Sequence, residues 1–351
     1  MNFIPQSMAA RPRVAIEIRP GAVIAARAAA PGPALEAVSR ADLPPGALDP
    51  SSKGPNLLDP TAVTAAVRQT LDAVCGKGSD RSRHVSLILP DAALRVLLLD
   101  FDELPAKPAE ALPVVRFRLK KLLPFDPDHA VVSYQIMSSA RGLIRVLAVA
   151  IPCPILAEYE ALVTAAGFLP GAVLPSTLAA IAGIDPTSPG TLLVNVDADT
   201  VTTAIVDGNL LLLHRTVDLR SEDLSPHLSP PALSSLLTDA ETPTSSPTYE
   251  DSVVASLNRT AILNPDAGSR EIAQGVSVAA AYFEDTLGLP PATVRSAGSI
   301  SPQQLQWTLE NHGLGPIAVR DLFDPSTLAP GAQTTRIEPS WLAGVHGALS
   351  T

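Results

Sequence analysis

The sequence predicts an α/β protein of two lobes, formed by a duplicated unit around a central cleft. A short hairpin pattern opens each half of the chain, at residues 14–24 and 192–205. Each copy has an apolar β-branched run, an acidic or amide residue, a tight polar turn and a second apolar run, which is typical of a β-hairpin. At 351 residues the chain is long enough for two domains of ordinary size.

The first lobe is expected to begin with residues 12–83. Residues 13–48 have the pattern of strands separated by Pro-rich turns. A helix should follow, with Asp59 as its N-cap and Pro60 in its first turn, and Gly76 should end it. Four apolar residues at helical spacing predict its buried face: Val63, Val67, Leu71 and Val74.

An inserted α+β subdomain is expected at residues 84–150. Its predicted elements are strands at 84–89, 94–99, 130–137 and 143–151, and a helix at about 110–123. One face of this helix is apolar, and its other side carries basic residues that suit either solvent or an acidic partner. The apolar face comprises Leu112, Val115, Leu119 and Leu122, and the basic residues are Arg116, Arg118, Lys120 and Lys121.

Residues 151–190 should complete the first lobe, with a helix at 155–166 that Gly167 ends. The second lobe is expected at 191–338, and it should contain a helix at 270–287. Within it, residues 219–251 are rich in Ser, Pro, Thr and acidic residues, which favours a mobile insertion. Residues 339–351 should form a short closing helix that packs on the first lobe.

The composition excludes several classes of function. A net charge of −10 and a pI near 5.0 argue against a general nucleic-acid binder. No stretch reaches the roughly 18 apolar residues that a membrane span needs. Only two cysteines, Cys75 and Cys153, are present, which favours a reducing cytoplasm over a disulfide scaffold. The six histidines have no metal-ligand spacing, so no metal site is predicted. No catalytic residue is predicted either.

The two hairpins resemble the phosphate-binding turns of the actin-like ATPase superfamily, whose lobes are duplicated ribonuclease-H-like units. In that superfamily each turn usually contains Asp-x-Gly, in which glycine lets the backbone approach phosphate. Here Glu17 and Arg19 stand in the first turn, and Asn195 and Asp197 stand in the second. The resemblance implies ATP with magnesium as cofactor, in a site that these substitutions make degenerate. The residues that it implies for nucleotide binding are Glu17, Arg19, Gly21, Asn195, Asp197, Thr200, Gly298 and Ser299.

The inserted segment carries a more specific sequence signal than the two hairpins. It contains Leu104-Pro105, then Val115-Arg116-Phe117, and then Leu123-Pro124-Phe125-Asp126. This order resembles the PilM-type proteins of type IV pilus assembly. The resemblance implies a cytoplasmic adaptor, peripheral to the inner membrane, that docks the N-terminal segment of a PilN-like membrane protein in a groove beside the insert. The residues expected to bind this partner are Leu94, Arg95, Val96, Leu97, Arg116, Phe117, Pro124 and Phe125.

Two alternatives stay open from the sequence. The chain could be an ATP-binding switch or weak ATPase of the same fold, or an adaptor of cell division or secretion. The strand at 94–99 is similarly ambiguous, because its apolar run suits either an exposed edge that accepts a partner or burial on both faces.

Overall fold

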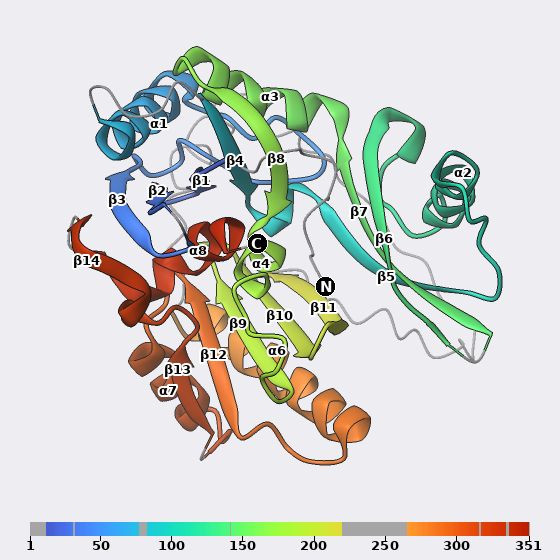
Figure 1. Ribbon diagram of the computed structural model, residues 1–351. Coiled ribbons are helices and arrows are strands. Elements are labelled where there is room, and N and C mark those ends of the chain that lie inside the picture. Colours follow the sequence, from blue (N-terminus) through green and yellow to red (C-terminus); the bar gives the residue numbers. More distant parts are fainter. Residues whose placement is uncertain are drawn as a thin grey trace, which may run out of the picture.

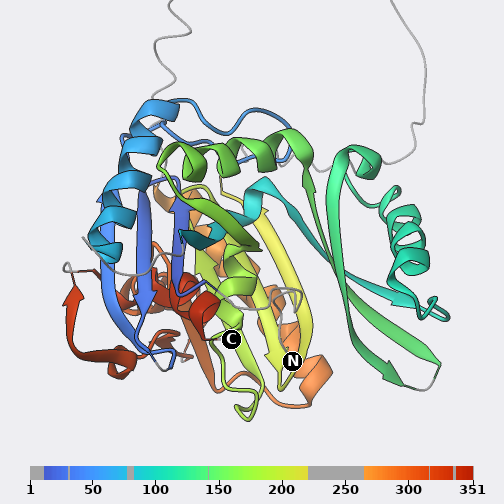
Figure 2. The same ribbon diagram turned by 45° about the horizontal axis from the view of Figure 1, so that its top comes forward.

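The structure is a computed structural model that describes residues 12–30, 32–76, 83–140, 142–219, 265–315, 317–334 and 337–350. Two β-sheets form the two lobes, and a third, smaller sheet stands beside them (Figures 1 and 2). The insertion expected at 219–251 lies outside the described residues from residue 220 onward.

The first lobe is a six-stranded sheet in the order β14-β3-β2-β1-β4-β8. Its strands are β1 (Val14–Arg19), β2 (Ala22–Ala28), β3 (Leu35–Asp42), β4 (His84–Leu89), β8 (Leu169–Pro175) and β14 (Leu328–Thr334). Helices α1 (Pro60–Cys75) and α3 (Cys153–Ala165) pack on one face. The predicted N-cap is confirmed, since the Asp59 carboxylate accepts from the Ala62 amide, and all four apolar residues predicted for the buried face of α1 are buried.

The second lobe repeats this plan. Its sheet has the order β11-β10-β9-β12-β13, which matches β3-β2-β1-β4-β8 strand for strand. Its elements are β9 (Thr191–Val196), β10 (Thr200–Asp207), β11 (Leu210–Asp218), α6 (Pro265–Leu287), β12 (Thr293–Gly298), α7 (Pro302–Asn311) and β13 (Ala318–Asp321). The predicted duplication is therefore present, and both predicted hairpins, β1–β2 and β9–β10, form.

The inserted sheet has the order β5-β7-β6, with α2 on the side away from the lobes (Figure 2). Its elements are η1 (Asp91–Ala93), β5 (Arg95–Phe101), α2 (Pro108–Leu119), η2 (Pro127–His129), β6 (Ala130–Ala140) and β7 (Leu143–Pro152). The strand at 84–89 lies outside this unit, because β4 pairs with β1 and β8 in the first lobe. The insert therefore begins after Leu89 rather than at residue 84.

Two further boundaries differ from the sequence prediction. Helix α2 ends at Leu119, whose carbonyl accepts from the amides of both Leu122 and Leu123 in a tight final turn before Pro124. Leu122 is consequently exposed rather than part of the apolar face. Strand β14, predicted within the second lobe, instead pairs with β3 in the first-lobe sheet.

The chain ends between the lobes. After η3 (Pro325–Thr327) and η4 (Pro339–Leu342), helix α8 (Ala343–Leu349) packs on α4 (Ser176–Ile181), on β1 and β2, and also on β12 of the second lobe. These elements share one hydrophobic core with both sheets. The closing helix thus packs on both lobes and not on the first alone.

Two glycines allow this close packing of α8. A Cβ at Gly347 would lie 2.0 Å from the Ala179 carbonyl oxygen, and a Cβ at Gly344 would lie 2.4 Å from a Glu17 carboxylate oxygen. Neither distance is sterically allowed, so the neighbouring elements would have to separate. The glycines that interrupt this segment in the sequence are therefore required for the contact between helices.

We expect Gly347→Ala to lower the free energy of unfolding by about 1–3 kcal/mol, the usual effect of overpacking a close contact. Urea unfolding followed by circular dichroism measures this. The matched control is Gly268→Ala in α6, where an added Cβ meets nothing within 4 Å. Because alanine is the better helix former, the control should be neutral or stabilising. Equal effects of the two substitutions would contradict the steric explanation.

Candidate functional site

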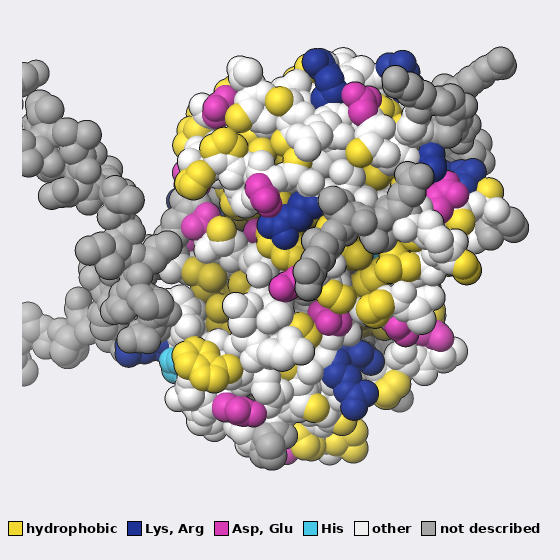
Figure 3. All heavy atoms as spheres, turned by 90° about the vertical axis from the view of Figure 1, so that its left-hand side faces the viewer, with side chains coloured by type: hydrophobic (Ala, Val, Ile, Leu, Met, Phe, Trp, Pro, Cys, Tyr) yellow, Lys and Arg dark blue, Asp and Glu magenta, His cyan; other side chains and the backbone are white. Residues whose placement is uncertain are grey.

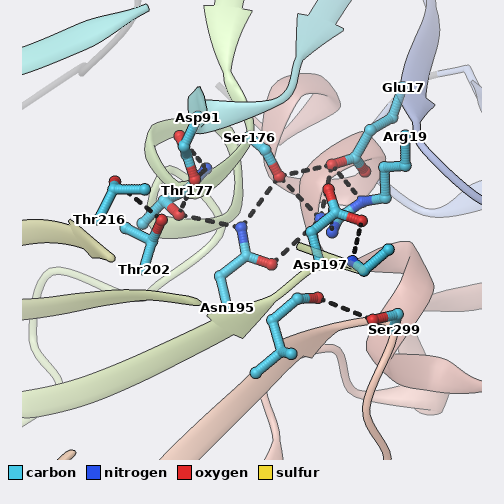
Figure 4. Close-up of polar contacts among 12 residues, drawn as sticks. Glu17, Arg19, Asp91, Ser176, Thr177, Asn195, Asp197, Thr202, Thr216 and Ser299 are labelled. Carbon is cyan, nitrogen blue, oxygen red and sulfur yellow. Dashed lines mark hydrogen bonds and ion pairs between the residues drawn. The ribbon is translucent and has the colours of Figure 1, made fainter. Parts of the chain in front are cut away.

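Polar side chains from both lobes meet at the centre of the molecule in one hydrogen-bonded group, which we call the interlobe cluster (Figure 4). Its members are Glu17, Arg19, Asp91, Ser176, Thr177, Asn195 and Asp197. Each of them lies within two residues of the end of a strand. Glu17 and Arg19 are two residues apart on β1, so both side chains project from the same face of the sheet.

Arg19 is the centre of this cluster. Its guanidinium is 2.7 Å from the Glu17 carboxylate and 3.6 Å from the Asp197 carboxylate. The same group donates to the Ser176 hydroxyl at 2.7 Å and to the Asn195 amide oxygen at 3.1 Å. Arg19 is 1% exposed and Glu17 is fully buried. One buried cation therefore links the two hairpin turns directly.

Asn195 continues the network on the second-lobe side. Its amide nitrogen donates to the hydroxyls of Ser176 at 3.0 Å and Thr177 at 2.9 Å, and Thr177 in turn donates to Asp91. A carboxylate at this position could accept hydrogen bonds but could not donate these two. The network thus explains why asparagine, rather than aspartate, fits this turn.

Burial and neighbouring charges shift the pKa values of Arg19 and Asp197 in opposite directions. Burial by itself lowers the pKa of the Arg19 guanidinium, but Glu17 and Asp197 raise it by more, so its pKa lies above the usual value. Burial raises the pKa of Asp197 from 3.8 to about 6, although Arg19 opposes this shift. The Asp197 side chain is only 11% exposed.

Of the other predicted nucleotide residues, Gly298 and Ser299 lie beside the cluster, whereas Gly21 and Thr200 are not part of it. Gly298 has a φ of +91°, and a Cβ there would be 2.0 Å from the Val196 carbonyl oxygen and 3.0 Å from the Arg19 guanidinium. The amide and hydroxyl of Ser299 both donate to that Val196 carbonyl, at 2.8 and 3.1 Å. Gly21 is exposed in the β1–β2 turn, and Thr200 faces a separate cavity.

Three cluster members were not predicted from the sequence: Asp91, Ser176 and Thr177. Asp91 and Ser176 each come directly after a proline at the end of a strand, in Leu89-Pro90-Asp91 and Leu174-Pro175-Ser176, and Thr177 follows Ser176. Polar residues after a strand and its proline are the signal that could have identified them.

The predicted partner residues do not form one concave surface. Pro124 and Phe125 line a groove of about 630 Å³ between the insert and the first lobe, which we call the junction groove. Its other lining residues are Ser52, Lys53, Gly54, Pro55, Asp126, His129, Pro152, Pro154, Ile155 and Glu158. Leu94, Arg95 and Val96 instead line a cavity of about 340 Å³ where the insert meets both lobes, which we call the three-way cavity.

The remaining three predicted partner residues lie elsewhere. Leu97 packs against the core beneath α2. Arg116 donates to the carbonyl oxygens of Pro127 and Ala130, so it holds the end of the insert together instead of forming a rim. Phe117 is 71% exposed and lines neither the groove nor the cavity.

The described surface and helices add two observations. On the face in Figure 3, basic and acidic side chains of the described residues are interspersed, so no continuous basic surface is present there. Within the described ranges, no helix is long and apolar enough to cross a membrane, and no three His, Cys, Asp or Glu side chains are grouped to hold a metal ion.

Comparison with known proteins identifies the architecture. No protein-family model and no curated protein sequence matches the chain. A solved PilM–PilN type IV pilus biogenesis complex contains a chain that aligns with a TM-score of 0.66 at 17% identity, over 96% of this chain and 98% of that chain. The predicted actin-like fold is confirmed.

Two other solved structures align less closely. A polyphosphate/ATP-glucomannokinase from Arthrobacter sp. strain KM has a TM-score of 0.41 at 13% identity, over 97% of each chain. The cytoplasmic domain of EpsL, from the type II secretion system of Vibrio cholerae, has a TM-score of 0.38 at 13% identity, over 59% of this chain and 71% of that one.

The charge of Asp197 should make stability depend on pH. Because its folded pKa is raised to about 6, the folded chain binds a proton more tightly than the unfolded chain between pH 4 and 6. This group therefore removes about 3 kcal/mol of stability as pH rises through that window. Asp197→Asn should lose this dependence and gain stability, relative to the parent, on the alkaline side.

Urea unfolding of the parent and of Asp197→Asn, on both sides of the window, tests this. Asp207→Asn is the matched control, because it removes an exposed carboxylate at the far end of β10. A constant difference between parent and Asp197→Asn at every pH would show that the Asp197 carboxyl does not titrate in this range.

Proposed function

We propose that this chain is an adaptor of type IV pilus assembly that docks the N-terminal segment of a PilN-like inner-membrane protein. The observation that carries the proposal is the junction groove, at the boundary between the insert and the first lobe of a chain that aligns with PilM along nearly its whole length. The adaptor would work in the cytoplasm and associate with the inner membrane through this partner.

The junction groove has the chemistry of a peptide site. Its walls are apolar where Phe125, Ile155 and several prolines meet, and Lys53, Asp126 and Glu158 provide a polar rim. Prolines have few conformations to lose, so the groove is largely preformed and a peptide would order little of the protein on binding. A segment containing Asn, Leu and Pro would fit, with its apolar side chains in the groove and its polar groups at the rim.

The interlobe cluster supports an adaptor over an ATPase. The Arg19 side chain occupies the turn where the superfamily has a glycine, and it is held there by Glu17, Ser176 and Asn195. Asp197 adds a carboxylate beside it, which would repel a phosphate at short range. These residues do not fit a nucleotide, and we infer that the site is degenerate.

Phe125→Ala should weaken binding of the partner peptide by about tenfold or more, as for other central aromatic contacts. Calorimetry with a synthetic peptide of about a dozen residues from the N-terminus of a PilN-like protein measures the affinity. The matched control is Phe117→Ala, which removes a phenyl ring of 71% exposure outside the groove and should leave the affinity unchanged.

Folding must be checked for both variants, since Phe125 also contacts the core of the insert. Leu97→Asp is unsuitable here, because Leu97 packs in that core and its substitution tests folding instead. Two results would contradict docking in the junction groove. One is no measurable binding of the peptide to the wild-type chain, and the other is an equal loss of affinity in both variants.

We also expect no ATP hydrolysis. The purified chain with magnesium and ATP should release no more phosphate than a boiled sample, because Arg19 and Asp197 stand where glycines would admit the phosphates. Steady turnover that disappears in Glu17→Gln, with the fold intact by circular dichroism, would instead favour the ATP-binding switch.

A further inference from the structure

The three-way cavity lies where three parts of the chain converge. The loop 50–53 comes from the first lobe, residues 92–96 begin the insert, and Thr200, His214, Thr216 and Asp218 come from the edge of the second lobe. Its volume of about 340 Å³ is at the lower end of the range for small-molecule sites. It is separate from the interlobe cluster, whose side chains do not line it.

Two cations face this cavity. Arg95 donates to the carbonyl oxygens of Leu94 at 2.7 Å and Ala92 at 3.3 Å, and it forms no ion pair within the part of the chain that the structure describes. Burial lowers its pKa, and no carboxylate offsets this effect. Lys53 is the second cation, and Asp218 is the one acidic residue of the described lining. The lining therefore carries a net positive charge.

Two polar atoms of the lining have no partner. The Ser52 hydroxyl oxygen is buried without a hydrogen bond, in a residue that is 4% exposed. The Nε2 atom of His214 is likewise buried without a hydrogen bond. Burial lowers the pKa of His214, so its imidazole is neutral near pH 7, and the ring also hydrogen-bonds its own backbone. A neutral imidazole has one donor and one acceptor nitrogen, so Nε2 remains as an acceptor. Buried polar atoms without partners are uncommon in native proteins, and these two keep a hydrogen-bonding capacity that a ligand can use.

The first-lobe wall of the cavity is rigid. Asn56 is fully buried and donates to the carbonyl oxygens of Ser51 at 2.8 Å and Gly54 at 2.9 Å. Its side-chain oxygen accepts from the Ser51 amide and from the Tyr159 hydroxyl. Ser52 is therefore held in place before any ligand arrives.

From this combination we propose that the three-way cavity binds a small oxyanion of the phosphate class. Arg95 and Lys53 would supply charge, the Ser52 hydroxyl would donate a hydrogen bond, and His214 Nε2 would accept one from a protonated oxygen of the anion. Asp218 limits the total negative charge that fits, which favours a compact anion such as free phosphate over the polyphosphate of a nucleotide.

The test is calorimetric titration of the full chain with inorganic phosphate in chloride buffer. We expect a dissociation constant on the order of 1 mM, weakened about tenfold or more in Arg95→Gln because a charge-assisted contact is lost. Arg118→Gln is the matched control: it makes the same change at an exposed arginine of α2 and should leave the affinity unchanged. Ser52→Ala should also weaken binding, and it should fold normally, since its hydroxyl has no partner to lose.

Three results would overturn the proposal: no binding of phosphate by the wild-type chain, equal loss in Arg95→Gln and Arg118→Gln, or unchanged affinity in Ser52→Ala. A parallel titration with ADP separates the sources of phosphate. If ADP displaces phosphate and its affinity is unchanged in Arg95→Gln, the anion binds in the central cleft. That result would also overturn the assignment. Peptide docking in the junction groove is measured independently and does not depend on any of these outcomes.

Discussion

The buried ion pair between Arg19 and Glu17 is the interaction around which the centre of the molecule is built. Taking an ion out of water costs several kcal/mol, which is recovered only if the charge is paired and its remaining hydrogen-bonding groups are satisfied. The Ser176 hydroxyl and the Asn195 amide oxygen accept from Arg19 Nη2, and Asp197 lies 3.6 Å from Nη1. Arg19 Nη1 and Glu17 Oε2 are buried without a hydrogen-bond partner among the described residues. The other side of Glu17 lies against Gly344, where a larger residue would not fit.

Arg19 also joins the two lobes, through its contacts with Asn195 and Asp197. Arg19 belongs to the first sheet and Asn195 to the second, and helix α8 packs against both sheets beside them. Opening the cleft would break the contacts of Arg19 with Asn195 and Asp197 and expose part of a shared hydrophobic core.

Local patterns predicted the repeated parts of the fold, because they are encoded by neighbouring residues. The hairpins and the face of α1 follow from alternation and from helical spacing, and both form as predicted. The partners of a strand are not encoded in this way. The apolar run of β4 fits the first-lobe sheet as well as the insert, and β14 returns to the first lobe across a long separation in sequence.

The same limit applies to the site. The sequence indicated that Glu17, Arg19, Asn195 and Asp197 would meet, because duplicated turns face each other in this fold. It could not show that Arg19 would contact Asn195 and Asp197, since that depends on how closely the lobes approach. The predicted partner residues are apolar or basic, but apolar character shows only that a side chain avoids water. It does not show whether Leu97 faces a core or Phe125 a groove.

The loop that Asn56 holds contributes residues to both proposed binding sites. Ser52 and Lys53 face both the junction groove and the three-way cavity, so these two spaces are separated by a single wall. Two ligands that share a wall cannot be thermodynamically independent if either one shifts it. By linkage, whatever factor an anion contributes to the affinity for a peptide, the peptide must contribute to the affinity for the anion.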